Sequence, residues 1–198
     1  MAPIKIAVLG STKGTDMQAI IDEIAANKLN AQIVLVVSDK KNAIILDRAK
    51  KHNIETFFVD YKKYSTREDT EKEIVKMLEH KKTELVLLIG FMKIISLYFV
   101  KKFERRIWNI HPSLLPKYAG GMNLDVHAQV IANKEKETGC TLHEVTEEVD
   151  KGKIILQKKC PVLASDTPET LKEKVQKLEQ EALLDAIKMV TSGKLHIG

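Results

Sequence analysis

The sequence is poor in cysteine and has no long hydrophobic run. Its two cysteines, Cys140 and Cys160, have neither metal-ligand spacing nor a partner motif, which indicates a reducing setting. The start MAPIKIAVLG lacks the apolar region and cleavage signal of a secreted protein. No segment approaches the roughly 18 to 20 apolar residues that cross a bilayer. We therefore expect a cytoplasmic protein with no membrane partner.

Two nucleotide-binding motifs are also missing. The segment GSTKGTDMQAII (residues 10–21) has Gly10 and Gly14 four positions apart, which fits neither the dinucleotide G-x-G-x-x-G motif nor the P-loop. What remains is a glycine turn that opens a helix, with Thr15 and Gln18 placed as a capping box. Free backbone amides at such a helix start suit a phosphate. A turn and cap without any ligand is the alternative.

Charge of one sign is not concentrated anywhere along the chain. Lys and Arg number 32 and Asp and Glu number 27, which leaves a net charge of +5. The basic residues are spread among the acidic ones, which argues against a nucleic-acid partner and weakly favours a small anionic ligand. The 198 residues are 44% hydrophobic and no low-complexity linker divides them. We expect one domain over residues 1–198.

Short apolar runs alternate with amphipathic segments in the first half of the chain. The apolar runs predict strands at residues 4–10, 31–39, 54–60 and 84–90, and the amphipathic segments predict helices at 16–28, 43–52 and 65–80. Strands that are apolar on both faces belong to a sheet covered by helices on each side. After residue 105 we expect a further strand, two strands around a turn at 150–153, and a helix over 167–190. The prediction is an α/β fold: a Rossmann-like, mostly parallel sheet flanked by helices, with a mixed or antiparallel C-terminal portion and a long terminal helix.

Polar side chains gather in WNIHPSLLPKY (residues 108–118), at the point where a predicted strand ends. Asn109 and His111 are two residues apart, so on a strand they point to the same face, and Pro112 holds His111 in an extended backbone. An amide N–H and an imidazole side by side can stabilise an oxyanion. A polar turn and a histidine buried for packing are the alternatives. Asp150, in EEVDKGKII, either caps a turn or reaches the same site.

Several motifs together resemble one family. GFMKIIS (90–96), NIHPSLLPKY (109–118) and VTEEVDKGKIILQ (145–157), with KGTDMQAII before them, closely resemble the phosphoribosylglycinamide formyltransferases, the folate-dependent transformylases of purine synthesis. The likeness covers almost the whole chain. It implies transfer of the formyl group of 10-formyltetrahydrofolate, the co-substrate, to the amine of glycinamide ribonucleotide, with no metal. It also implies a phosphate-binding half (1–100) and a folate-binding, catalytic half (101–198).

The resemblance also implies roles for individual residues. The catalytic residues would be Asn109, His111 and Asp150. The phosphate and ribose of the substrate would meet residues of the glycine turn and two helices: Gly14, Thr15, Asp16, Arg67, Gln176 and Glu179. The folate would meet Met92, Lys93, Ile94, Ile95 and Asn109. Core packing is the alternative for Met92 and Ile95, and a solvated helix face is the alternative for Gln176 and Glu179.

Three features depart from the family pattern. Asp16 replaces an asparagine, Lys93 replaces an arginine, and AGGMNLDVHAQ (119–129) lengthens the segment to His127, which we expect to lie in a loop over 117–127. A carboxylate beside a phosphate is repulsive unless Lys13 or Arg67 compensates. The partners expected are small molecules, and the protein is expected to be a monomer or a homodimer. The alternatives are a 10-formyltetrahydrofolate hydrolase, a formyltransferase for another amine, and a non-catalytic binding module.

Overall fold

The computed structural model describes residues 2–121 and 124–198, and a seven-stranded sheet runs through them. In sheet order the strands are β3 (Thr56–Phe58), β2 (Ala31–Ser38), β1 (Ile4–Leu9), β4 (Leu85–Leu88), β5 (Ile107–His111), β6 (Glu137–Glu144) and β7 (Ile154–Pro161). The first five are parallel to one another, and β6 and β7 continue the sheet antiparallel. The predicted mostly parallel sheet with an antiparallel C-terminal portion is confirmed.

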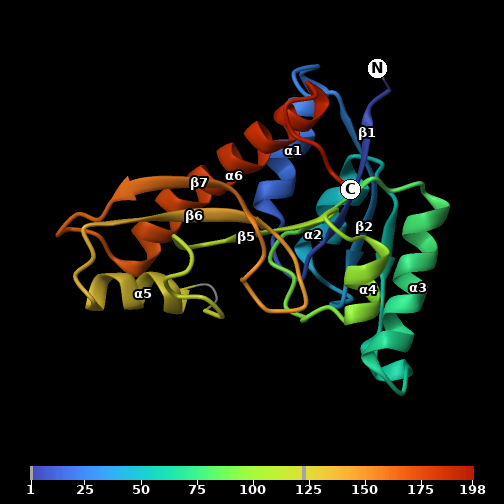
Figure 1. The fold of residues 1–198 in the computed structure, drawn as a ribbon, viewed down its shortest axis with the longest axis horizontal. Coiled ribbons are helices and arrows are strands. Elements are labelled where there is room, and N and C mark those ends of the chain that lie inside the picture. Colours follow the sequence, from blue (N-terminus) through green and yellow to red (C-terminus); the bar gives the residue numbers. More distant parts are fainter. Residues whose placement is uncertain (1, 122–123) are drawn as a thin grey trace.

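Helices cover both faces of the sheet (Figure 1). The helices are α1 (Thr15–Ala25), α2 (Ile44–Lys51), α3 (Arg67–His80), α4 (Leu97–Lys102), α5 (Leu124–Ala132) and α6 (Pro168–Thr191), with the short 3-10 helix η1 (Tyr61–Lys63). Figure 1 shows α3 and α4 well apart from α1 and α6. The long terminal helix is confirmed as α6, and a capping box between Thr167 and Thr170 fixes its start. Within the described residues, no helix is both long enough and apolar enough to cross a membrane.

Alternate side chains of β1 enter two separate hydrophobic cores. Ile6 and Val8 pack in the core that includes Met17 of α1. Ala7 and Leu9 pack in the core that includes Phe99 of α4. Successive strand residues point to opposite faces, so a strand between two helical layers has to be apolar throughout. This explains the continuous apolar runs in the first half of the sequence.

The structure differs from the sequence-based expectations at two helices. The predicted capping box of Thr15 and Gln18 is wrong, because the N-cap of α1 is Gly14 and no side chain caps the helix. The Gln18 side chain instead donates to Asp22 at 2.7 Å. The segment expected to be a loop as far as His127 becomes helical at the start of α5, so His127 lies within a helix.

The order of the strands places the site. β1 has β2 on one side and β4 on the other. The connection after β1 therefore leads to one half of the sheet, and the connection after β4 leads to the other half. In open α/β sheets the crevice at such a switch point, outside the carboxyl ends of the strands, collects ligands. Both the glycine turn after β1 and the segment 90–96 after β4 lie at this end of the sheet.

Candidate active site

A cavity of about 680 Å³ opens at the carboxyl ends of β1, β4 and β5. Its walls come from the turn after β1, the segment after β4, the end of β5, the β6–β7 connection and helices α5 and α6. Residues from both halves of the chain therefore line one cavity. All but one of the residues predicted for the site line it: Gly14, Thr15, Asp16, Met92, Lys93, Ile94, Ile95, Asn109, His111, Asp150, Gln176 and Glu179.

The exception is Arg67, which lies outside the lining of this cavity. Its guanidinium donates to the carbonyl of Ile94 at 2.9 Å. This contact places Arg67 beside the segment predicted to meet the folate, rather than beside the glycine turn. The structure thus gives no support to a phosphate contact for this side chain.

The three predicted catalytic residues meet at the end of β5. His111 Nε2 lies 3.3 Å from Asp150 Oδ2, and both side chains are almost fully buried. Asp150 reaches β5 from the turn between β6 and β7, where its backbone is left-handed with φ of 57°. The backbone N–H of Gly120 also donates to Asp150 Oδ2, at 2.8 Å. A carboxylate, an imidazole and an amide therefore converge on one wall of the cavity.

One member of this group, His143, was not predicted from the sequence. It lies on β6 directly opposite Asn109 in the antiparallel register, and its Nε2 is 3.4 Å from Asp150 Oδ1. Asp150 therefore bridges two histidines. In the sequence, His143 stands out only as a histidine in the LHEV segment of a predicted strand. The β5–β6 register is needed to show that it faces Asn109.

The hydrogen bonds of His143 couple its protonation to Asn109. Its Nδ1 lies 2.9 Å from the carbonyl of Glu144, which can only accept, so Nδ1 carries the hydrogen. Its Nε2 lies 3.1 Å from Asn109 Nδ2. A neutral His143 accepts the amide N–H at this atom, whereas a protonated one donates to Asp150. The neutral form fixes the Asn109 amide with its second N–H left for a ligand.

His111 has acceptors at both ring nitrogens. Its Nδ1 lies 3.0 Å from Ser113 Oγ, and that hydroxyl donates to the carbonyl of Lys117 at 2.7 Å. Its Nε2 lies 3.1 Å from the carbonyl of Gly121 and also faces Asp150. Burial lowers the pKa of His111, and although Asp150 opposes this, the pKa stays below its ordinary value. The resting imidazole is neutral. Because acceptors face both of its ring nitrogens, the ring can take up a second proton.

The surroundings of Asp150 favour its charged carboxylate form. Burial alone would raise the pKa of Asp150, but the contact with His143 and the N–H of Gly120 outweigh that effect, and the pKa lies below its usual value. Asp150 is therefore charged at neutral pH. A negative charge beside His111 stabilises the imidazolium that would form when this histidine takes up a proton.

The glycine turn after β1 brings the start of α1 to the cavity. Gly14 has φ of 66°, and a Cβ on it would lie 2.4 Å from Ile45 Cγ1, so only glycine fits. The first intrahelical bond runs from Gln18 N–H to the carbonyl of Gly14 at 3.1 Å. The amides of Thr15 and Asp16 precede it and have no intrahelical partner, which is the arrangement that suits an anion.

Asp16 and Glu179 form an acidic pair at this end of the cavity. Asp16 is buried, and burial raises its pKa to about 6, opposed by a hydrogen bond with Gln180. Burial, and next the charge of Asp16, raise the pKa of Glu179 well above its usual value, while Lys172 opposes this. Burial therefore makes both carboxyl groups easier to protonate than they are in water. The Asp16 carboxyl faces α6, and one of its oxygens, Oδ1, has no hydrogen-bond partner.

The segment after β4 and the β6–β7 connection form a more apolar part of the cavity wall. Met92 and Ile94 are exposed, at 37% and 61%, and Val149 faces the cavity from the β6–β7 connection with 47% exposure. Ile95 is buried in the core. The Nζ of Lys93 lies over the ring of Tyr61, 5.4 Å from its centroid. Exposed apolar side chains around a cavity mouth suit a flat, largely apolar ligand group.

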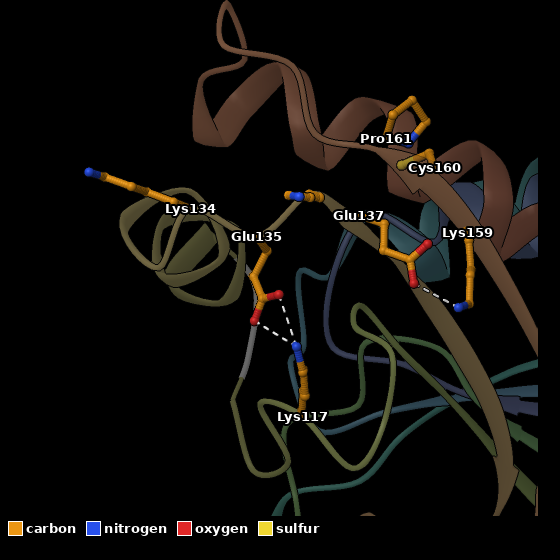
Figure 2. Close-up of a pocket in the computed structure, with 8 residues that line it drawn as sticks. Lys117, Lys134, Glu135, Glu137, Lys159, Cys160 and Pro161 are labelled. Atoms are coloured by element: carbon orange, nitrogen blue, oxygen red, sulfur yellow. Dashed lines mark hydrogen bonds and ion pairs between the residues drawn. The ribbon is translucent and has the colours of Figure 1, made fainter.

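A second hollow, more open and about 730 Å³ in volume, is lined by residues of the segments 134–137 and 159–161 and by Lys117 (Figure 2). Figure 2 shows two ion pairs in it, Lys117 with Glu135 and Lys159 with Glu137. None of the residues predicted for the active site lines it. Among the described residues there is also no group of three or more His, Cys, Asp or Glu side chains placed to hold a metal ion. The cavity at the strand ends is the candidate active site.

Comparison with known proteins shows the family to which the chain belongs. The formyl transferase family model matches residues 4–187. Phosphoribosylglycinamide formyltransferase of Escherichia coli strain K12 is 37% identical over 192 residues, covering 97% of this chain and 89% of that protein. The trifunctional purine biosynthetic protein adenosine-3 of Gallus gallus is 42% identical over 195 residues; the match covers 98% of this chain, which spans 19% of that longer protein. The structure of glycinamide ribonucleotide transformylase 1 from Symbiobacterium toebii has a TM-score of 0.92 and 34% identity, covering 100% of this chain and 92% of that one. The chain belongs to the formyl transferase family.

Proposed function

We propose that this protein transfers the formyl group of 10-formyltetrahydrofolate to the primary amine of glycinamide ribonucleotide, a step of purine synthesis. The observation that carries the proposal is that Asn109, His111 and Asp150 meet in one cavity, which is also lined by a helix start that suits a phosphate and by exposed apolar side chains. The glycine turn and α6 would take the phosphate and ribose. Residues 92–95 would take the folate.

The chemistry begins with attack by the amine nitrogen on the formyl carbon. The carbonyl π electrons move to oxygen, and the second N–H of Asn109, together with an N–H of His111, stabilises the resulting oxyanion. The intermediate collapses when the bond from carbon to the folate nitrogen breaks. One proton leaves the attacking amine and one proton reaches the departing nitrogen, so the reaction is balanced without any net uptake.

His111 and Asp150 would move that proton. The acceptors around both ring nitrogens of His111 allow it to hold a proton for part of the cycle, and the charged Asp150 stabilises that state. In this scheme His143 is a positioning residue, because it fixes the amide of Asn109 and contacts Asp150. The attack, the collapse of the intermediate and the proton transfer do not require a metal ion.

The proposal extends to the setting of the protein. Its partners would be two small molecules, with no nucleic acid or membrane, and it would work in the cytoplasm as one domain, as a monomer or a homodimer. Sedimentation or light scattering would decide between the two assembly states. The assignment of Arg67 to the phosphate is set aside in favour of the folate side, because of its bond to Ile94.

An assay with purified protein tests the reaction. The protein is given 10-formyltetrahydrofolate with and without glycinamide ribonucleotide, and both the folate product and the formylated amine are measured. We expect one formylated amine for each tetrahydrofolate released, and little release without the amine. Equal release without any amine would indicate a hydrolase instead, and formylation only of another amine would change the substrate but keep the reaction.

A further inference from the structure

Ser113 carries a buried hydroxyl beside the catalytic histidine. The residue lies just beyond the end of β5, is 0% exposed and does not line the cavity. Its Oγ lies between two groups, with Nδ1 of His111 at 3.0 Å and the carbonyl of Lys117 at 2.7 Å. A hydroxyl has lone pairs with which to accept but only one hydrogen to donate. The group that receives this hydrogen therefore depends on whether Nδ1 is itself protonated.

The surroundings of Nε2 fix the tautomer of the neutral His111 ring. Nε2 lies 3.1 Å from the carbonyl of Gly121 and 3.3 Å from Asp150 Oδ2. A carbonyl and a carboxylate can only accept a hydrogen bond. A neutral ring therefore places its hydrogen on Nε2 and keeps a lone pair on Nδ1. The hydroxyl of Ser113 can donate to that lone pair.

Uptake of a proton by His111 reverses this hydrogen bond. Nδ1 then carries a hydrogen, and Ser113 Oγ has to accept from it. The hydrogen of the hydroxyl turns to the carbonyl of Lys117, which is within hydrogen-bond distance and can only accept. The hydroxyl thus pairs with Nδ1 in both protonation states of the ring.

The chain around Ser113 is held by two strands without the help of its hydroxyl. Thr141 of β6 donates to the carbonyl of Ser113 at 2.7 Å and accepts from the N–H of Leu115 at 3.0 Å. Gln157 of β7 donates to the carbonyl of Leu115 and to Thr141 Oγ1, each at 2.9 Å. The backbone is therefore fixed by other bonds, and the hydrogen of the Ser113 hydroxyl can turn while the backbone stays in place.

We propose that Ser113 is a positioning residue for His111, and that its hydroxyl reverses its hydrogen bond to Nδ1 each time the ring gains or loses a proton. The ring keeps one orientation while its charge changes, so Nε2 stays directed at Asp150. A hydrogen bond to a charged group contributes more than one between neutral groups, so Ser113 favours the imidazolium. The inference deepens the proposed function and rests on it for the reaction that the proton serves.

Two titratable groups also act on His111, namely Asp150 from the turn between β6 and β7 and His143 from β6. Burial has the largest effect and lowers the pKa of His111, Asp150 opposes it, and His143 adds to it. Removal of the Ser113 hydroxyl leaves both groups in place. A change in the titration of His111 in such a variant therefore reports on the hydrogen bond at Nδ1.

Nuclear magnetic resonance of the imidazole nitrogens tests the proposal without any turnover, because it gives both the tautomer and the pH midpoint of the ring. We expect neutral His111 in the unchanged protein to carry its hydrogen on Nε2. Ser113→Ala should move the midpoint of the His111 titration down by roughly one pH unit, the difference between a charged and a neutral hydrogen bond.

Gln157→Leu is the matched control. It also removes a side-chain hydrogen bond to a carbonyl of this turn, but Gln157 neither contacts His111 nor lines the cavity. It should lower the free energy of unfolding without moving the His111 midpoint. The proposal is overturned if neutral His111 carries its hydrogen on Nδ1, if Ser113→Ala leaves the midpoint in place, or if both variants move it equally. Should Ser113→Ala fail to fold, the tautomer in the unchanged protein still decides.

Kinetics separate this inference from the proposed function. In the formyl-transfer assay, Ser113→Ala should lower kcat by roughly tenfold, the change that one pH unit makes in the ratio of the two protonation states. Both KM values should stay nearly unchanged, because the hydroxyl touches His111 and not a substrate. A protein whose Ser113 controls the titration of His111 but which formylates no ribonucleotide keeps this inference and loses the proposed function. Formyl transfer with an unaltered kcat in Ser113→Ala does the reverse.

Discussion

Asn109 and His143 face each other across β5 and β6, with 3.1 Å between the amide nitrogen of Asn109 and Nε2 of His143. The Nδ1–H of His143 is committed to the carbonyl of Glu144, so a neutral ring has only a lone pair to offer the amide. The orientation of Asn109, and with it the N–H available to an oxyanion, therefore depends on His143.

Substitution of His143 should reduce turnover more than it affects binding. We expect His143→Leu to lower kcat by up to about a hundredfold, because a misdirected Asn109 amide loses part or all of the stabilisation that one oxyanion donor provides, with smaller changes in either KM. His143→Gln, whose carbonyl can accept the Asn109 N–H, should retain more activity. Steady-state kinetics would measure this, and equal activities for Leu and Gln would show that His143 does not act through Asn109.

The three residues that would touch the reacting atoms should be more sensitive. Asn109→Ala, His111→Ala and Asp150→Ala are each expected to cut kcat by on the order of a hundredfold or more, because a transition-state donor or a proton carrier is lost. Circular dichroism and thermal unfolding should show folded proteins. Near-normal turnover of His111→Ala would contradict the mechanism, whereas global unfolding would point to a packing role.

Much of the fold could be predicted from the sequence because the signals were local. The nearly continuous apolar runs of β1, β2 and β4 reflect burial on both sheet faces, as β1 shows with Ile6 and Ala7 in different cores. Asn109 and His111 were visible as a pair, because residues two apart on one strand share a face. The predicted capping box of Thr15 and Gln18 was wrong, because the N-cap of α1 is the left-handed Gly14, which has no side chain with which to cap.

The features of the site that could not be predicted from the sequence depend on contacts between distant segments. His143 joins the site only through the β5–β6 register. Arg67 lies beside Ile94 because of how α3 packs, which its own neighbours in the sequence do not reveal. Asp16 was expected to repel a phosphate as a free charge, but it is buried beside Glu179, and burial raises the pKa of both carboxyl groups. Such a shift of the pKa depends on tertiary packing, which the local sequence does not reveal.

His127 should make the protein sensitive to mild acid. An unfolded histidine titrates near pH 6.5, whereas burial lowers the pKa of His127 to about 4 in the folded protein. The unfolded state therefore binds the proton first, and this contribution to stability is full above pH 6.5 and is lost as the pH falls towards 4. The shift corresponds to at most about 3 kcal/mol.

Urea unfolding of His127→Asn at pH 7.5 and pH 5 measures this effect. We expect the variant to lose less stability than the unchanged protein between the two pH values, since asparagine does not titrate. Equal losses in both proteins would mean that His127 is not held neutral by its surroundings.

Asp16 should give the opposite dependence on pH. Its pKa rises from about 3.8 in the unfolded chain to about 6 in the folded protein because it is buried, so the folded state binds the proton more tightly. The stability that this provides is full below pH 3.8 and is lost as the pH rises through 6. At neutral pH the buried charge therefore destabilises the folded protein, by at most about 3 kcal/mol.

Asp16→Asn should raise the free energy of unfolding at pH 7.5 and bring little or no gain near pH 4, as measured by urea unfolding at both values. A variant that is less stable than the parent at pH 7.5 would show that the carboxylate makes a favourable contact, with Lys172 or another cation, that outweighs its burial.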